Sequence, residues 1–390
     1  MKVIDYIKNI FNKEPKFEEY PLNSKWMFDN ELKPLWKNIE KCKEFYALKA
    51  TKQSPKWHKE GNAWEHTKLV SKYMREYVTS KFDLTNPTEF EEARLLMTSA
   101  LFHDIGKPST TFFDDSDSDW HCKNHGEVGE KITRKLLEDE SVIFREKVCW
   151  LVRNHMVFHY FMEKSDAEKL KIVNKLAKGL VPIEYLTALH ISDCSGSISP
   201  ENKPEELSKK VGIIKAIANS SYDKCPEFSN AIPNLKGPKA YIMIGVAGSG
   251  KDTFIKRHLP NTECICRDDF RELVTYNEVK GQKLYLDKNG ENKVTQMVND
   301  AIEDACLNHR DIVINQTSLI KKYRKALVDK IKEYDPNYNI IYIYVEPLCG
   351  VEVCKERRKG EIKPEIIQGM WDRLEFPDFN ECNNIFIIET

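Results

Sequence analysis

Apolar residues recur at three- and four-residue spacing through the first half of the chain. This spacing is typical of helices that bury one face, because one turn takes 3.6 residues. It predicts helices within residues 67–78, 90–103, 126–137, 143–155 and 183–194. We therefore expect the whole stretch from 32 to 219 to be helical.

The pattern changes at Ala240. Short apolar runs then alternate with helical stretches, and they predict strands within residues 241–244, 263–266, 311–315 and 339–345. Strands that alternate with helices predict a central parallel sheet with helices on both faces. The predicted fold class is therefore two domains, an all-α helical bundle followed by an α/β domain.

Changes in composition predict the domain boundaries. Residues 220–239 are rich in Pro, Ser, Asn and Gly, which is typical of a linker. We expect an N-terminal extension over 1–30, the helical domain over 31–219, the linker over 220–239 and the α/β domain over 240–390.

Composition narrows the class of protein. The chain has 390 residues, of which 41% are hydrophobic, and this favours globular domains over disorder. The formal net charge of -1 argues neither for nor against a nucleic-acid partner. Eleven cysteines stand singly, so we expect reduced thiols in a cytoplasmic protein. No apolar run approaches the ~18 residues of a membrane span, so no membrane partner is expected.

A His-Asp doublet, His103-Asp104, ends one of the predicted helices. Further metal-ligand types stand on other predicted helices: His66, His125, His155 and Asp193. Imidazoles and carboxylates together suit divalent transition metals, which polarise phosphoryl oxygens and ionise water near neutral pH. The sequence therefore predicts a hydrolytic metal centre in the first domain.

The order of these residues resembles the HD-domain phosphohydrolase superfamily. More narrowly, the runs around Trp57-His58, Trp64-Glu65-His66 and Asn124-His125-Gly126 resemble the HD domains attached to bacterial tRNA nucleotidyltransferases. The resemblance covers roughly residues 54–196.

The resemblance implies roles for individual residues. One metal ion would be held by four side chains, and a second ion would extend the site: His66, His103, Asp104 and Asp193 for the first, His125 and His155 for the second. Lys107, His58 and His121 would contact phosphate, with Lys107 serving catalysis. His159 and His190 are interpreted as structural.

A glycine-rich loop follows the first strand predicted in the second domain. It runs Gly245-Val246-Ala247-Gly248-Ser249-Gly250-Lys251-Asp252-Thr253. Backbone N–H groups of such a loop surround the β-phosphate of a nucleotide, and its lysine bridges the β- and γ-phosphates. We therefore expect ATP or another NTP with Mg²⁺. The residue after the lysine is usually Ser or Thr, but it is Asp252 here. Either Asp252 contacts the Mg²⁺ ion, directly or through water, or the hydroxyl of Thr253 takes the role of the usual Ser/Thr.

The run Arg267-Asp268-Asp269-Phe270-Arg271 follows the second predicted strand. A carboxylate at the end of a strand can orient an incoming hydroxyl and accept its proton, as kinases require. An arginine three residues later can bind an acceptor phosphate through two hydrogen bonds. These residues favour a kinase over other proteins with a phosphate loop.

The same run resembles the phage polynucleotide 5′-kinases, and the resemblance continues at Asn315-Gln316-Thr317 and along residues 354–370. It implies that Asp268 is the general base, that Arg271 holds the acceptor's phosphate and that Thr317 lies near the phosphates. Arg357 or Arg358 would stabilise the transferring γ-phosphoryl group. Gln316 departs from the family, which has an acidic residue there.

Three functions remain open. The favoured one is a bifunctional enzyme that phosphorylates the 5′-OH ends of RNA or DNA and removes 2′,3′-cyclic, 2′- or 3′-phosphates. The architecture resembles known HD-plus-kinase repair proteins, and it implies that a separate RNA ligase then joins the healed ends. The second is a small-molecule nucleotide phosphohydrolase fused to a nucleoside or nucleotide kinase. The third makes the helical half a nucleic-acid-binding module with structural metals, although its ligands outnumber those of one closed site.

Overall fold

The computed structural model describes residue 17 and residues 22–199, 203–275, 286–348 and 350–390. The chain divides into two compact units. The first comprises Met1–Ala177 and Val181–Cys225, and the second comprises Lys178–Leu180 and Pro226–Thr390. The expected extension over 1–30 lies outside the described residues, apart from 17 and 22–30. The boundaries at 30, 219 and 239 stay predictions.

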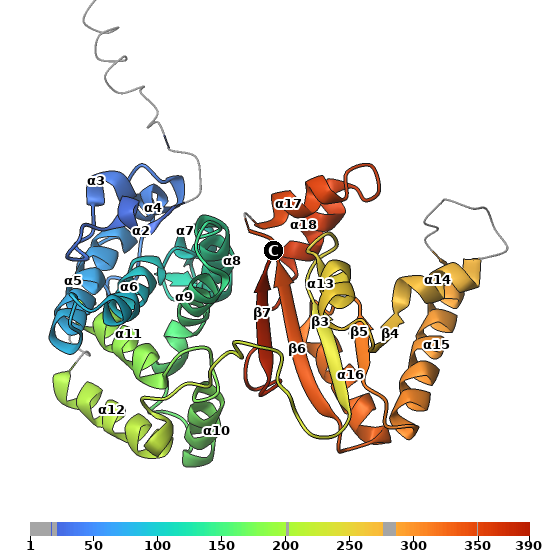
Figure 1. Cartoon of the computed structure of the whole chain (residues 1–390). Coiled ribbons are helices and arrows are strands. Elements are labelled where there is room, and N and C mark those ends of the chain that lie inside the picture. The colour runs from blue at the N-terminus through green and yellow to red at the C-terminus, as the bar shows by residue number, and fades with distance from the viewer. Residues whose placement is uncertain (1–16, 18–21, 200–202, 276–285, 349) are drawn as a thin grey trace, which may run out of the picture. The chain divides into compact units, whose positions relative to one another are not determined.

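The first unit is built from helices, coloured blue to green in Figure 1. Its longer helices are α5 (Ala63–Lys81), α6 (Pro87–Phe102), α8 (His125–Leu136), α9 (Val142–Asn154), α10 (Asp166–Leu176), α11 (Ile183–Gly196) and α12 (Pro204–Ala218). Shorter ones are α2 (Ser24–Met27), α3 (Trp36–Ile39), α4 (Lys43–Ala47), α7 (Lys107–Thr110), η1 (Leu48–Ala50), η2 (His155–Phe158) and η3 (Asn219–Ser221). Each helix predicted from apolar spacing is confirmed.

Polar side chains fix where these helices begin. Asn62 accepts a hydrogen bond from the Glu65 N–H at the start of α5, and Asn86 does the same for α6. Ser165 and Glu168 form a reciprocal capping box at the start of α10. Such caps satisfy backbone donors that a helix leaves unpaired. The start of α5 is thereby fixed one turn before His66.

One part of the helical prediction over 32–219 is wrong. Strands β1 (Thr111–Asp114) and β2 (Asp119–Cys122) form an antiparallel hairpin in which Phe112 pairs with His121 and Phe113 with Trp120. Aromatic and β-branched side chains favour strands, and the Asp- and Ser-rich stretch between them favours a turn.

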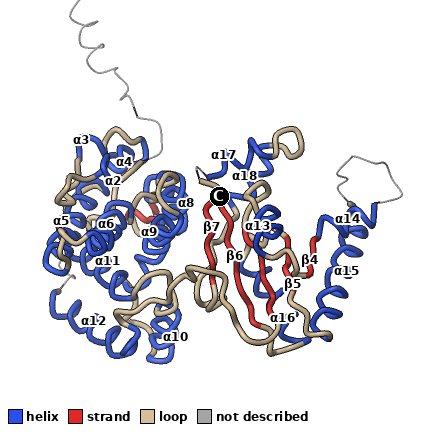
Figure 2. The backbone as a smooth tube through the Cα atoms, viewed as in Figure 1, coloured by secondary structure: helices blue, strands red, loops and turns tan. Residues whose placement is uncertain are grey.

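The second unit contains a five-stranded parallel sheet in the order β4-β5-β3-β6-β7, red in Figure 2. The strands are β3 (Lys239–Ile244), β4 (Glu263–Cys266), β5 (Ile312–Asn315), β6 (Asn339–Glu346) and β7 (Ile385–Glu389). The helices are α13 (Lys251–His258), α14 (Arg267–Thr275), α15 (Lys288–Leu307), α16 (Lys321–Tyr334), α17 (Gly350–Arg357) and α18 (Pro364–Asp372). Four strands were predicted, and β7 was missed.

The sheet topology brings the ends of separate strands together. β3 is the central strand, and it leads directly into the glycine-rich loop and α13. Tyr241 and Met243 on one face of β3 pack against Phe254 and Ile255 of α13. Because parallel strands end at the same edge of a sheet, the residues that follow β3, β4 and β5 meet there.

Candidate active sites

The first unit brings six sequence-predicted metal ligands into one buried cluster. Each side chain is at most 6% exposed. They come from α5, from the end of α6 and the turn after it, from the starts of α8 and η2, and from α11: His66, His103, Asp104, His125, His155 and Asp193. A Cβ on Gly106 would lie 2.1 Å from the His125 carbonyl oxygen, so only glycine allows α8 this close to the His-Asp turn.

The Asp104 carboxylate lies between two sets of ligands. Its Oδ2 atom is 3.3 Å from His103 Nε2 and 3.7 Å from His66 Nε2. Its Oδ1 atom is 3.5 Å from His125 Nε2 and 3.8 Å from His155 Nε2. Each carboxylate oxygen therefore faces a different histidine pair, an arrangement that suits two neighbouring cations.

Tautomers support this interpretation. His103 Nδ1 lies 2.8 Å from the Ala100 carbonyl oxygen, and His155 Nδ1 lies 2.6 Å from that of Val152. A carbonyl only accepts, so Nδ1 carries the proton and the Nε2 lone pair of a neutral ring points into the cluster. Among the described residues His103 Nε2 has no hydrogen-bond partner. A buried lone pair facing carboxylate oxygens is what a metal ion would satisfy.

Asp193 completes the first set. Its Oδ1 atom is 2.9 Å from His66 Nε2, and its Oδ2 atom accepts from His159 Nε2 at 2.8 Å. His159, which the sequence analysis interprets as structural, thus holds a candidate ligand in place. His190 lies deeper, with its ring 4.8 Å from that of His159.

The sequence prediction missed Glu60. Glu60 Oε1 lies 3.0 Å from His66 Nδ1 and 2.7 Å from His58 Nδ1. Burial opposes ionisation of this carboxyl, but the hydrogen bonds from His58 and His66 outweigh it and lower the pKa of Glu60. The only sequence signal was its position two residues after His58.

Lys107 is buried and points to the same cluster. Its Nζ atom lies 2.7 Å from Asp104 Oδ2 and donates to Gln53 Oε1 at 2.6 Å. Two other predicted phosphate contacts lie further out. His58 is partly exposed with its ring against His66, whereas His121 is on the hairpin, where it pairs with Asp117 at 2.8 Å.

Charge balance in the cluster differs between its two halves. Burial disfavours the charged imidazole, and it lowers the pKa of His125 to about 4 and that of His155 well below the ordinary range. Burial acts on His66 as well, but hydrogen bonds to Asp193 and Glu60 raise its pKa to about 9. His125 and His155 are therefore neutral near pH 7, the form that binds a metal, whereas His66 would have to release a proton when a metal ion binds.

In the second unit the glycine-rich loop adopts the backbone that its sequence demands. Gly248 has φ +86°, and a Cβ there would lie 2.7 Å from the Cys354 carbonyl oxygen. Lys251 Nζ donates to the carbonyl oxygens of Gly245 and Val246, at 2.9 Å each. The Gly245 N–H donates to the Thr317 carbonyl oxygen at 3.0 Å, which brings Thr317 next to the loop.

Asp252 lies in the first turn of α13. Its Oδ1 atom accepts from Asn315 Nδ2 at 2.7 Å, and its Oδ2 atom is 3.6 Å from the Arg358 guanidinium. Asn315, at the end of β5, was not predicted as a site residue. Arg357 instead donates to the Gly248 carbonyl oxygen at 3.2 Å.

A cavity of about 550 Å³ opens beside this loop. Its lining contains much of the loop, the end of β7 and both arginines expected to stabilise the γ-phosphoryl group, Arg357 and Arg358, here called the lid arginines. The full lining is Gly248, Gly250, Lys251, Asp252, Thr253, Phe254, Arg257, His258, Arg357, Arg358, Ile388, Glu389 and Thr390. Ala247 and Ser249 lie in the same loop, outside this lining.

The predicted general base and acceptor-binding arginine lie together on α14. Arg271 Nη1 donates to Asp268 Oδ1 at 2.6 Å, and Arg271 Nε donates to Glu291 Oε1 at 2.8 Å. Asp268 is 74% exposed at its side chain, so its other oxygen is open to an incoming hydroxyl. Glu291, from α15, was missed because nothing in the local sequence connects it to Arg271.

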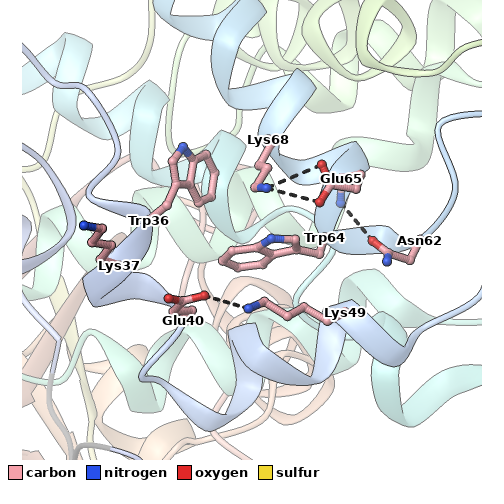
Figure 3. A pocket seen from close by; sticks show the side chains of 8 residues that line it. All are labelled: Trp36, Lys37, Glu40, Lys49, Asn62, Trp64, Glu65 and Lys68. Carbon is pink, nitrogen blue, oxygen red and sulfur yellow. Dashed lines mark hydrogen bonds and ion pairs between the residues drawn. The ribbon is translucent and has the colours of Figure 1, made fainter.

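A second, shallow pocket of about 390 Å³ lies in the first unit (Figure 3). It is lined by Trp36, Lys37, Glu40, Lys49, Asn62, Trp64, Glu65 and Lys68. Lys49 pairs with Glu40 at 2.6 Å and Lys68 with Glu65 at 3.1 Å. None of the sequence-predicted site residues lines this pocket.

Two family models match the chain. The model described as an HD domain matches residues 63–216, and the model described as an AAA domain matches residues 241–367. The protein therefore consists of a helical HD domain followed by a P-loop, kinase-like AAA domain with a five-stranded parallel sheet. No helix among the described residues is long and apolar enough to cross a membrane.

Individual similar proteins cover only parts of the chain. A bifunctional uridylyltransferase/uridylyl-removing enzyme of Methylococcus capsulatus is 30% identical over 122 residues, 29% of this chain and 12% of that protein. The chain thus spans a small fraction of the curated relatives it matches. A Pnkp1/Rnl/Hen1 complex has a chain with 23% identity and a TM-score of 0.28, covering 34% of this chain and 43% of that one. A gluconokinase from Sinorhizobium meliloti has 17% identity and a TM-score of 0.28, covering 40% and 84%.

Proposed function

We propose that this protein is a bifunctional nucleic-acid end-healing enzyme. The AAA domain transfers the γ-phosphate of ATP to a polynucleotide 5′-OH, and the HD domain removes a 2′,3′-cyclic, 2′- or 3′-phosphate. The observation that carries the proposal is that one chain has residues suited to two opposite phosphate chemistries. For phosphate removal, the Asp104 carboxylate lies between two histidine pairs. For phosphate transfer, the second unit has a phosphate loop and the hydrogen-bonded pair Asp268 and Arg271.

In the HD domain, the side chains of His66, His103, Asp104 and Asp193 would hold one divalent ion, and His125 and His155 a second that shares Asp104. Such ions supply Lewis-acid polarisation of phosphoryl oxygens. His159 orients Asp193 through a hydrogen bond, and Glu60 lies within ion-pair distance of His66. Lys107, close to Asp104, would bind a non-bridging phosphate oxygen and neutralise charge that develops there.

In the AAA domain, the loop N–H groups and Lys251 bind the triphosphate of ATP, and Mg²⁺ accompanies it. Asp268 accepts the proton of the acceptor hydroxyl as the hydroxyl oxygen attacks the γ-phosphorus, while the bond from the γ-phosphorus to the β–γ bridging oxygen breaks and ADP leaves. Arg271 binds the phosphate next to that hydroxyl. Arg357 or Arg358 neutralises the γ-phosphoryl oxygens, and both line the same cavity as Lys251.

A second candidate is a small-molecule nucleotide phosphohydrolase joined to a nucleoside or nucleotide kinase. One observation favours it: Arg271 is already paired with Asp268 and Glu291, so it must exchange a partner before it binds an acceptor phosphate. An acceptor without that phosphate would require no exchange.

The two candidates differ in their acceptor. With ATP and Mg²⁺, the end-healing enzyme should phosphorylate a 5′-OH oligonucleotide with a higher kcat/KM than the matching nucleoside. Faster phosphorylation of the nucleoside would instead support the small-molecule kinase. Lys251→Ala should abolish either reaction, which serves as the control for a contaminating kinase.

RNA ends with a 5′-OH and a 2′,3′-cyclic phosphate would leave this enzyme ready for joining, so we propose a separate RNA ligase as the partner that acts next. We also propose a cytoplasmic location. Seven of the described cysteines are free thiols, which is typical of a reducing compartment: Cys122, Cys149, Cys264, Cys266, Cys306, Cys354 and Cys382.

A further inference from the structure

Asp252 places a carboxylate where most phosphate loops have a neutral hydroxyl. It follows Lys251 directly in α13, and its side chain is 57% exposed in the cavity that also contains Thr253 and Arg358. The phosphates of a bound nucleotide would enter the same cavity. A full negative charge therefore lies beside the expected position of a polyanion.

The structure shows what balances this charge. Asn315 donates to one carboxylate oxygen at 2.7 Å, and the Arg358 guanidinium is 3.6 Å from the other. Asn315 is neutral, so Arg358 is the cation closest to Asp252 among these contacts, and its Nη1 atom also donates to Glu361 at 2.9 Å. Lys251 is occupied by two backbone carbonyls at 2.9 Å. The same Arg358 is a candidate for neutralising the γ-phosphate.

When a nucleotide enters without a metal ion, its phosphates and the Asp252 carboxylate compete for Arg358. If Arg358 turns to the phosphates, Asp252 loses its counter-charge next to an anion. If Arg358 stays with Asp252, the phosphates lose an arginine. The repulsion between the Asp252 carboxylate and a phosphate charge at roughly 5 Å follows from Coulomb's law. With an effective dielectric constant of about 20, it would weaken the affinity for the nucleotide on the order of 100-fold.

We propose that Asp252 makes nucleotide binding conditional on a divalent cation. A cation held by Asp252 and the phosphates cancels the repulsion and frees Arg358 to contact the nucleotide. Affinity for the nucleotide and affinity for the cation are then coupled, and by linkage each raises the other equally. The inference rests on the proposed role of the loop in binding ATP.

Equilibrium binding of ATP, measured by calorimetry on the full chain, tests this proposal without relying on turnover. Each variant is measured in excess Mg²⁺ and again in EDTA, and the ratio of the two Kd values is the coupling. Asp252→Ser restores the common hydroxyl, and Asp252→Asn keeps an acceptor for Asn315 without the charge. Asp300→Asn removes an exposed carboxylate of α15 in the same unit and is the matched control.

We expect the coupling in the native chain and in Asp300→Asn to exceed that of both Asp252 variants by at least about tenfold, which lies within the usual range for linked sites. The difference should come from tighter binding by the variants in EDTA. Equal coupling in all four proteins overturns the inference and leaves ATP binding intact. Failure of the native chain to bind ATP even with Mg²⁺ overturns the kinase proposal itself, and the inference with it.

Discussion

At the residue scale, the HD centre depends on which atoms hold each ligand in place. His66 is fixed at both ring nitrogens, by Asp193 at 2.9 Å and by Glu60 at 3.0 Å. A carboxylate behind a metal-binding histidine fixes the ring orientation and raises its basicity. In the proposed metal centre Glu60 would therefore position the ring of His66.

Glu60→Gln should weaken binding of divalent metal by about 10- to 100-fold, because the amide retains the size of Glu60 but not its charge. Competition with a chromophoric chelator measures the affinity directly. Glu76→Gln, which changes an exposed glutamate of α5, the helix that carries His66, should bind metal as the native chain does. Native-like affinity in Glu60→Gln would show that Glu60 does not support the site.

Arg271 provides the corresponding test in the AAA domain. If it binds the phosphate of an oligonucleotide acceptor, Arg271→Gln should lower kcat/KM for that acceptor by about 10- to 100-fold, the usual worth of a charge-assisted hydrogen bond. Activity towards a nucleoside that lacks this phosphate should fall much less. Arg373→Gln, at an exposed arginine that donates to a backbone carbonyl, is the control. An equal loss for both acceptors would assign Arg271 to orienting Asp268.

At the element scale, helices α8 and α9 carry His125 and lead to His155, and buried ion pairs hold them together. Arg134 on α8 donates to Glu146 on α9 at 2.9 and 2.7 Å, and Arg145 donates to the same carboxylate at 2.9 Å. All three side chains are at most 7% exposed. Loss of one partner would leave buried charge uncompensated.

Glu146→Gln should therefore lower the free energy of unfolding of the HD domain by about 3–5 kcal/mol at pH 7, measured by urea denaturation. Burial raises the pKa of Glu146, but Arg134 and Arg145 outweigh it and lower the pKa below 4.5. A carboxyl group whose pKa is lowered by folding stabilises the folded state above pH 4.5. This stabilisation is lost as the pH falls through the pKa of the folded state. The difference in unfolding free energy between Glu146→Gln and the native chain should thus shrink in acid. The control Glu127→Gln changes an exposed glutamate of α8 and should leave the unfolding free energy unchanged.

Sequence reasoning succeeded where the signal is local. The His-Asp doublet, the glycine-rich loop and the helices with regular apolar spacing are all contiguous patterns. It failed at the β1–β2 hairpin, which interrupts a region otherwise built from helices, and at β7, the last strand of the sheet. Asn315 and Glu291 were missed because their partners, Asp252 and Arg271, come from other parts of the chain, and only the fold brings them together. Glu60 was missed although His58 and His66 are close in sequence, because an isolated glutamate in a turn forms no recognisable motif.

At the scale of the whole molecule, the candidate residues of each site come from a single unit. All six candidate metal ligands lie in the first unit, whereas the loop, Asp268, Arg271 and the lid arginines lie in the second. A change at one centre should therefore leave the other chemistry intact. This separation allows one preparation to test both halves of the proposed function.

The most direct measurement is an assay on one RNA that carries a 5′-OH at one end and a 2′,3′-cyclic phosphate at the other, with ATP, Mg²⁺ and a panel of transition metals. The native chain should convert both ends, Asp104→Asn only the 5′ end, and Lys251→Ala only the 3′ end. Modification of neither end by the native chain, together with rapid phosphorylation of free nucleosides, would contradict the end-healing function.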